Sequence, residues 1–367
     1  MISPPERICP FQVNCYFATS EDAPDIVRLM NEEAYPGDLS LAFSRTDDPV
    51  ASLEAENDGS FTVIARDDDG SPIAMCGAIP RYMYIGGELK LVAYVTGMRR
   101  KKSYKKMINW KKIFAEMNST ADYDASICCI YSDNDHMLNM MSKKRGKMPY
   151  SLPIAKTTEF FYSPRVRVKD PHPELEFSNV TEKDLDQVIN FLREQGSRHD
   201  LFPKLDSISD IKGLKPEDLY CLKRDGKVVA AAAMWDRRDV KQFRLNECRG
   251  KMKIVRALNP LLSLLGYVTI PPDDTLIKFA YVAFMESEND DTSLMISLFA
   301  RMKEAAGGPY DLLCLSTTNA GPKYRAFKKI RGITMTQHIV QIVMQGINDK
   351  PAADIDGDKM DIECALL

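Results

Sequence analysis

The stretch Phe114-Ala115-Glu116-Met117 occurs again, with one substitution, as Phe299-Ala300-Arg301-Met302, at an offset of 185 (299 − 114). Further matches follow in the same order along the chain: Asp69-Gly70 with Asp225-Gly226, Ala93-Tyr94-Val95 with Ala280-Tyr281-Val282, and Asn134 with Asn319. Their offsets are 156 (225 − 69), 187 (280 − 93) and 185 (319 − 134). An ordered series with a drifting offset indicates an internal repeat. The sequence therefore predicts two copies of one unit, and the rise in offset from 156 to 187 places an insertion in the second copy, between positions 230 and 280.

Size and composition are those of a globular protein with two domains. The chain has 367 residues, of which 44% are hydrophobic and 28% are charged, so each copy can bury its own core. The net charge of −3 and the lack of an aromatic RNA-binding motif give no case for a nucleic-acid partner. No apolar run reaches the length of a membrane span, and the first residues lack a signal-peptide pattern. We therefore expect a soluble, cytoplasmic protein with no nucleic-acid and no membrane partner.

The nine cysteines and four histidines form no metal-binding pattern. There is no CxxC pair, and Cys128-Cys129 lie side by side in an apolar run, where neighbouring side chains point to opposite faces of a strand. In a reducing compartment such cysteines are buried free thiols. Residues 354–358 resemble part of a calcium loop but lack its glutamate and its flanking helices, so we interpret them as an acidic linker. We expect no metal.

Hydrophobic periodicity predicts the same order of elements in both copies. In the first copy we expect strands at 15–18, 61–66, 73–78, 89–98, 125–131 and 157–168, and helices at 20–30, 105–117 and 134–144. In the second copy we expect strands at 175–179, 219–224, 227–235, 276–285, 311–316 and 340–344, and helices at 181–194, at 292–306 and from 322. Alternating strands and helices with a central hairpin predict a mixed α/β sheet with helices on both faces. The predicted domains are residues 1–169 and 170–367, and the stretch 361–367 has the pattern of a final edge strand.

This order of elements, and the stretch Val95-Thr96-Gly97-Met98-Arg99 running into Tyr104-Lys105, resemble the GCN5-related N-acetyltransferase (GNAT) superfamily. Two later stretches carry the same resemblance: Asn134 with Lys143-Lys144-Arg145-Gly146, and Asn319 with Lys328-Lys329-Ile330-Arg331-Gly332. In that family the pyrophosphate of acetyl-CoA lies at the start of a helix that follows a splayed strand, where free N–H groups and the helix dipole favour an anion. The resemblance implies two tandem GNAT-like acyl-CoA N-acyltransferase domains.

The resemblance also implies that the first copy binds acetyl-CoA or another acyl-CoA as co-substrate. The residues implied in binding are Val95, Gly97, Met98, Arg99, Arg100, Lys101, Lys102, Ser103, Tyr104, Lys105, Lys106 and Asn134. The family's three glycine positions fall on Lys106, Ile108 and Trp110, and the tryptophan is expected to crowd the groove, so that cationic side chains replace amides as phosphate ligands. A solvated basic loop on a degenerate domain is the alternative. In the second copy the corresponding turn, residues 286–291, carries four carboxylates that repel an anion. We expect the first copy to be active and the second to be structural.

The catalytic groups stay open at this point. Many members of the family use a tyrosine to protonate the leaving thiolate, and that position is Met141 here. Tyr131 and Tyr104 are alternatives for the acid. The alternatives for the general base are Glu159, His136 and the acids around Asp133.

The insertion in the second copy, residues 235–272, combines basic and apolar stretches. Residues 249–256 form a basic, helix-like stretch, and the apolar run 258–268 after it is interrupted by Pro260. One interpretation is a lid or docking surface. The other, which we favour from the sequence, is packing that covers a sheet edge or the seam between the copies.

The sequence thus favours an acyl-CoA-dependent N-acyltransferase that transfers an acetyl group to a small-molecule or peptide amine. The alternative is a non-catalytic GNAT-like module that binds a ligand or another protein. If the protein is an acyltransferase, acetyl-CoA should stabilise it against thermal unfolding. A thermal-shift titration measures this.

Overall fold

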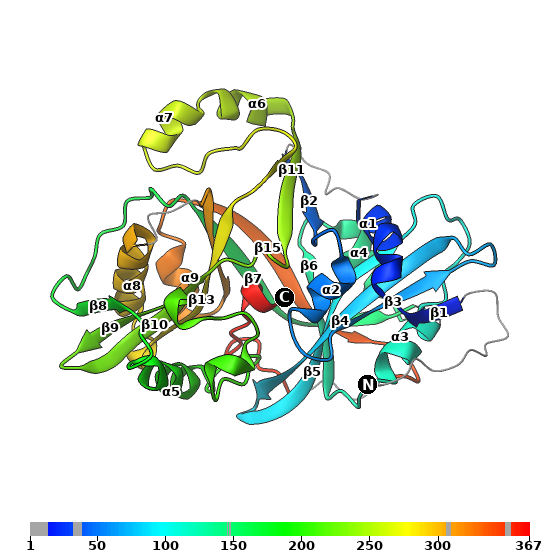
Figure 1. The fold of residues 1–367 in the computed structure, drawn as a ribbon, viewed down its shortest axis with the longest axis horizontal. Coiled ribbons are helices and arrows are strands. Elements are labelled where there is room, and N and C mark those ends of the chain that lie inside the picture. The colour runs from blue at the N-terminus through cyan, green and yellow to red at the C-terminus, as the bar shows by residue number, and fades with distance from the viewer. Residues whose placement is uncertain (1–13, 32–38, 145, 147, 306–309, 349–353) are drawn as a thin grey trace.

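The computed structural model describes residues 14–31, 39–144, 146, 148–305, 310–348 and 354–367. The chain start, on which the signal-peptide expectation rests, and Arg145 and Ala306 lie outside this range. Twelve strands of the described residues form one continuous mixed sheet (Figure 1). From edge to edge they are β1 (Asn14–Phe17), β3 (Phe61–Arg66), β4 (Pro72–Ile85), β5 (Glu88–Arg100), β6 (Ala125–Tyr131), β15 (Ile333–Val343), β7 (Tyr150–Tyr162), β14 (Leu312–Thr318), β13 (Phe279–Ser287), β10 (Lys227–Trp235), β9 (Leu219–Arg224) and β8 (Glu176–Asn179). The predicted α/β class with a mixed sheet is confirmed.

Each half of the sheet contains a hairpin followed by a pair of parallel strands. The hairpins β3–β4 and β9–β10 turn at Asp-Gly pairs, where Gly70 and Gly226 adopt positive φ angles of 80° and 76°. Strand β5 pairs with β6 in parallel at residues 92–94, and β13 pairs with β14 at residues 279–281. Residue 279 follows residue 92 at the same offset as Ala280 follows Ala93 in the sequence repeat. The two halves therefore share one strand register.

The two halves exchange their last strands. Strand β7, which ends the first copy in the sequence, lies between β15 and β14. Strand β15, from the second copy, lies between β6 and β7. The seam between the halves is thus made of main-chain hydrogen bonds as well as side-chain packing. The boundary near residue 169 stays a prediction, and each half of the sheet is completed by a strand of the other.

Helices cover both faces of the sheet, as expected. Neighbouring residues of β10 face opposite sides: Ala231 belongs to the core under α5 (Leu185–Gly196), and Ala232 to the core under α8 (Thr292–Ala305). Strand β3 divides its residues in the same way between α1 (Ala23–Asn31) and α3 (Trp110–Asn118). The other helices of the two halves are α2 (Pro49–Glu54), α4 (Asp135–Met141) and α9 (Pro322–Phe327).

Several local predictions were wrong, including the bounds of the strands expected at 157–168 and 340–344, which are Tyr150–Tyr162 and Ile333–Val343. The helix expected at 105–117 begins only at Trp110, because the cations at 99–106 are unfavourable at the positive end of a helix dipole. The helix expected at 134–144 ends at Met141, with Ser142 as its C-cap. Residues 361–367 form no strand; residues 360–366 are buried, which an edge strand facing solvent would not allow, and Cys364–Leu366 form a single 3-10 turn.

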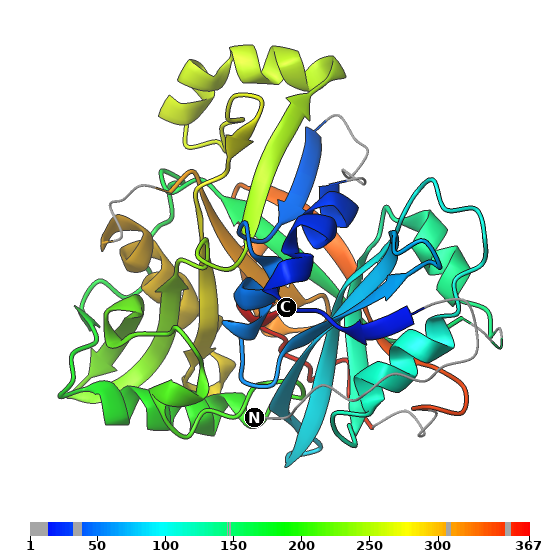
Figure 2. The same cartoon turned by 45° about the vertical axis from the view of Figure 1, so that its right-hand side comes forward.

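The insertion reaches across to the first half. Strand β11 (Gln242–Cys248) pairs with β2 (Leu39–Ser44) and with β12 (Thr275–Leu276) in a second, three-stranded sheet. From this sheet α6 (Gly250–Ala257) and α7 (Asn259–Leu264) project at the top of the molecule (Figures 1 and 2). Among the described residues, no helix combines the length and the apolar character needed to span a bilayer.

Candidate active site

Strands β5 and β6 form a fork, because they pair only at residues 92–94 and then diverge. Beyond this point β5 contains a bulge, where its register with β4 shifts between Met75 and Gly77. Gly97 lies in the bulge with a φ angle of +59°, a conformation that glycine adopts without the steric cost of a Cβ. Neither Gly97 nor Met98 has a paired residue on β4 or β6. The bulge therefore lies beside the open end of the fork.

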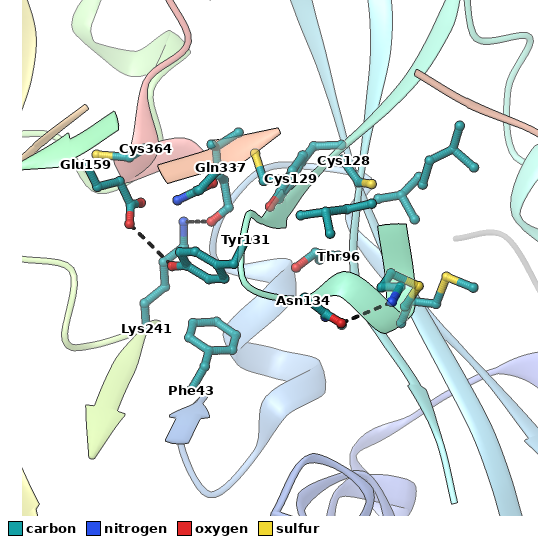
Figure 3. Close-up of a pocket in the computed structure, with 18 of the residues that line it drawn as sticks. Phe43, Thr96, Cys128, Cys129, Tyr131, Asn134, Glu159, Lys241, Gln337 and Cys364 are labelled. Carbon is teal, nitrogen blue, oxygen red and sulfur yellow. Dashed lines mark hydrogen bonds between the residues drawn. The ribbon is translucent and has the colours of Figure 1, made fainter. Parts of the chain in front are cut away.

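A cavity of about 160 Å³ lies in this fork (Figure 3). The ends of β5 and β6, the start of α4 and one residue of β7 form the walls from the first half. The second half contributes Lys241, Phe243, Tyr281, Gln337, Ile342, Cys364 and Leu367. The cavity is thus shared by both halves, as the strand exchange and the crossing of β11 require.

Glu159 of β7 is the buried acid of the cavity. It is 8% exposed, and its Oε2 accepts a hydrogen bond from the Tyr131 hydroxyl at 3.3 Å (Figure 3). Burial raises the pKa of Glu159 to about 7, because desolvation outweighs the hydrogen bonds of Gln337 and Tyr131 and the charge of Lys241. A carboxyl group with a pKa near 7 is suited to accept a proton at neutral pH.

Lys241 is a buried cation beside the same cavity. Its Nζ lies 3.1 Å from Glu56 Oε2 and donates to the main-chain oxygen of Ala365 at 3.1 Å. Burial lowers the pKa of Lys241 to about 8, although the charge of Glu56 opposes this. For Glu56 burial acts to raise the pKa, but the charges of Lys241, Arg45 and Arg237 outweigh it and lower the pKa. This cluster joins the insertion, the first half and the C-terminal tail at one wall of the cavity.

The residues expected to bind acyl-CoA fall into two groups. Five of them line the cavity: Val95, Gly97, Met98, Arg99 and Asn134. The other seven lie outside it, at the end of β5 and on the following loop: Arg100, Lys101, Lys102, Ser103, Tyr104, Lys105 and Lys106. Asn134 also caps α4, since its Oδ1 accepts from the Met137 N–H at 3.1 Å.

Trp110 does not line the cavity, contrary to the expectation that it crowds the groove. It is 4% exposed and packs in the core with Ile113 and Phe114. The late start of α3 explains the difference, because Trp110 then lies in the first turn, on the face of the helix that meets the sheet.

The structure separates the catalytic candidates that the sequence left open. Glu159, Tyr131 and Met141 line the cavity. His136 and Asp133 are exposed, and neither they nor Tyr104 line it.

Among the lining residues that the sequence did not indicate are Phe43, Lys241 and Gln337. Each lies in a stretch without a motif and reaches the site through long-range strand pairing, so no local signal could have found them.

The second half contains the same fork, but the C-terminal tail fills it. Phe284 corresponds to Gly97 at the offset that relates Ala280 to Ala93, and it adopts a φ angle of +52° at the matching bulge of β13. Its main-chain N–H donates to Glu363 Oε1 at 2.7 Å, and residues 360–366 of the tail are buried. The bulge amide of the second half is therefore bonded by the chain's own tail.

Two clusters of potential metal ligands occur among the described residues: Glu159 with Cys314 and Cys364, and His199 with Glu286 and Asp290. In the first, the hydrogen bond with Cys364 and burial raise the pKa of Cys314 well above its usual value, which keeps the thiol protonated and a poor ligand. In the second, Lys323 Nζ lies 3.0 Å from Glu286 and already supplies a positive charge. Both observations favour the expectation of no metal, which stays a prediction.

The fold can be compared with known proteins. No protein-family model matches the sequence, and no curated protein matches it. The structure is similar to that of Saccharomyces cerevisiae N-myristoyltransferase with bound myristoyl-CoA, with a TM-score of 0.56 and 11% identity over 98% of this chain and 91% of that chain. It is also similar to a GCN5-related glucosamine N-acetyltransferase region of a fungal multi-domain β-N-acetylglucosaminidase, with a TM-score of 0.61 and 9% identity over 92% of this chain and 39% of that chain.

The chain has the GNAT fold. In this GNAT fold the cavity lies at the fork of the first half, and in the second half the tail residue Glu363 accepts a hydrogen bond from the bulge amide. These similarities show the fold alone. Any reaction has to be inferred from the side chains of the cavity.

Proposed function

We propose that this GNAT-fold protein is an acyl-CoA-dependent N-acyltransferase whose reaction takes place in the cavity between β5 and β6. The position of Glu159 in the cavity and its raised pKa support this proposal most strongly. They place a proton acceptor with a pKa near 7 in the same enclosed space as the bulge of β5. Acylation of an amine needs both a base for the amine proton and N–H donors for the charge that develops on the carbonyl oxygen.

In the proposed reaction a neutral amine attacks the thioester carbonyl carbon. The C–N bond forms, the C–S bond breaks, and the amine proton passes to Glu159. Main-chain N–H groups at Gly97 and Met98 stabilise the developing negative charge on the carbonyl oxygen. The leaving thiolate takes up a proton, for which we propose the Tyr131 hydroxyl, one of the donors that line the cavity.

The loop after β5 fits an anionic co-substrate. Six Lys and Arg residues lie between positions 99 and 106, and the sequence has no carboxylate between Glu88 and Glu116. Carboxylates lie near two of these cations: Lys106 Nζ is 3.6 Å from Asp67, and the charge of Lys101 acts on Asp69. The turn at 286–291 of the second half carries four carboxylates instead. This contrast supports the first half as the one that holds the phosphates of CoA.

The size of the cavity favours a short acyl group. Its volume of about 160 Å³ is close to the ~150 Å³ of an engineered cavity that holds one benzene molecule. We therefore propose acetyl-CoA, or another short-chain acyl-CoA, and a small-molecule or peptide amine as the two substrates.

The test is the release of free CoA thiol from acetyl-CoA in the presence of small amines and peptides, with mass spectrometry of the acylated product. We expect thiol release that depends on an amine and weakens as the acyl chain lengthens. Binding of acetyl-CoA without thiol release, for every amine tried, would instead favour the non-catalytic binding module.

A further inference from the structure

The projecting α6–α7 segment, residues 249–270, is called the arm here. Its sequence contains four basic residues and no acidic residue, in a chain whose net charge is −3. Arg249 and Arg256 pair with Glu247 and Asp273, at the base of the arm, at 2.8 and 2.6 Å. Lys251 and Lys253 are exposed, and no carboxylate of the described residues pairs with either.

Large apolar side chains are exposed along the arm. Six of the eleven exposed large hydrophobic residues in the described part of the chain belong to it: Ile254, Leu258, Leu261, Leu264, Leu265 and Tyr267. Leu264 is 76% exposed and Ile254 is 67% exposed. These exposed side chains lie on α6, on α7 and shortly after each of them. The favoured expectation that the insertion is packing does not explain this concentration, because packing would bury these side chains.

A basic surface adjoins the end of the arm. Five exposed cations line a hollow together with Leu265: Arg167, Lys169, Lys328, Lys329 and Arg331. No acidic residue of the described chain lines this hollow. Arg331 donates to the main-chain oxygen of Leu265 at 3.2 Å, and its guanidinium lies 4.3 Å from the centre of the Tyr267 ring. The apolar face of the arm and the basic surface are therefore continuous.

We propose that the arm and this basic surface dock onto an anionic lipid bilayer. Exposed leucines and a tyrosine beside exposed Lys and Arg residues match the two requirements of an interfacial helix, which inserts apolar side chains between lipids and attracts their negative head groups. A second copy of the chain fits less well, because its own basic arm would face the first with like charge. In this proposal the protein binds the surface of the bilayer and does not span it. The proposal therefore differs from the expectation of no membrane partner, which was based on the lack of a spanning segment.

The test is co-sedimentation of the full chain with vesicles of phosphatidylcholine alone and of phosphatidylcholine with phosphatidylserine. We expect binding to the anionic vesicles, weak binding to the neutral ones, and release by salt. Leu261→Asp with Leu264→Asp, and separately Lys251→Glu with Lys253→Glu, should each weaken partition by at least about tenfold.

Matched controls lie far from the arm. Leu89→Asp changes another exposed leucine, 40% exposed, at the β4–β5 hairpin, and Lys215→Glu with Lys227→Glu reverses two other exposed lysines. These variants should bind vesicles like the wild type, and all variants should keep the wild-type circular dichroism and melting temperature. Equal binding to neutral and anionic vesicles, or unchanged binding of the arm variants, would overturn the proposal. The proposal would also be overturned if the wild type were a dimer and the variant with Leu261→Asp and Leu264→Asp a monomer. The arm would then be an interface between copies.

Discussion

At the scale of single residues, burial is what suits Glu159 to the role of base that we propose for it. An exposed glutamate is fully ionised and a weak base at neutral pH, whereas burial raises the pKa of Glu159 to about 7. The hydrogen bond from Tyr131 and the charge of Lys241 act in the opposite direction, so they set how far the pKa rises.

The first prediction follows from this role. Glu159→Gln should lower kcat/KM by about 10²- to 10⁴-fold. The wild-type rate should rise with pH through about 7, as Glu159 loses its proton, and the variant should lack this limb. The matched control is Glu363→Gln, at the buried acid of the filled fork, which should keep the activity. Equal losses in the two variants, measured by thiol release, would show that Glu159 acts through stability alone.

The second prediction concerns stability. The folded pKa of Glu159, about 7, lies above its ordinary value of 4.5, so the folded state binds this proton more tightly than the unfolded state. The stability that the protonated carboxyl contributes is fully present below pH 4.5 and is lost as the pH rises through about 7. Relative to the wild type, Glu159→Gln should therefore gain up to about 3 kcal/mol in the free energy of unfolding across this window. Urea denaturation of both proteins at several pH values measures the difference, and a difference that does not change with pH would contradict the raised pKa.

At the scale of elements, the fork depends on the bulge in β5. The parallel pairing stops after residue 94, and Gly97 follows with its positive φ angle. In the second half Phe284 adopts nearly the same φ angle at the same place in the repeat. The bulge is thus a property of both copies, and only its surroundings differ.

The third prediction tests the bulge. Gly97→Ala should cost about 1 kcal/mol of stability, because alanine is strained at positive φ, while its new Cβ meets Met75 Cε at an ordinary 3.5 Å. Gly70→Ala, at a φ of +80° with no atom within 4 Å of the new Cβ, should cost a similar amount. Thiol release should fall by at least about tenfold only in Gly97→Ala, since small displacements at the reacting carbonyl are costly. Similar rates of thiol release by the two variants would show that the bulge has no role in the reaction.

The sequence predicted the hairpins and the parallel strands of both halves because their signals are local. Asp-Gly turns and β-branched runs mark these elements wherever they lie in the fold. The exchange of β7 and β15 has no such signal, since each strand has the same pattern whichever neighbour it pairs with. The basic loop was found from its composition. Lys241 and Phe43 were not, because only the pairing of β2 with β11 brings them to the cavity.

At the scale of the whole molecule, one repeated unit supplies two forks with different surroundings. The first fork has a cavity, a buried acid and a loop rich in cations. The second has its bulge amide bonded to Glu363 and four carboxylates in the following turn. The insertion and the tail of the second copy complete the wall of the first fork. The second half thus supplies residues to the site in the first half. In our proposal the second half has no active site of its own.

Equilibrium dialysis of labelled acetyl-CoA against the full chain tests this claim most directly. We expect one molecule of acetyl-CoA bound per chain. Binding should weaken by at least about tenfold when Arg100→Glu and Lys101→Glu are combined, and should be unchanged when Lys215→Glu and Lys227→Glu are combined. No binding at millimolar ligand, two molecules per chain, or equal affinity in the two double variants would contradict it.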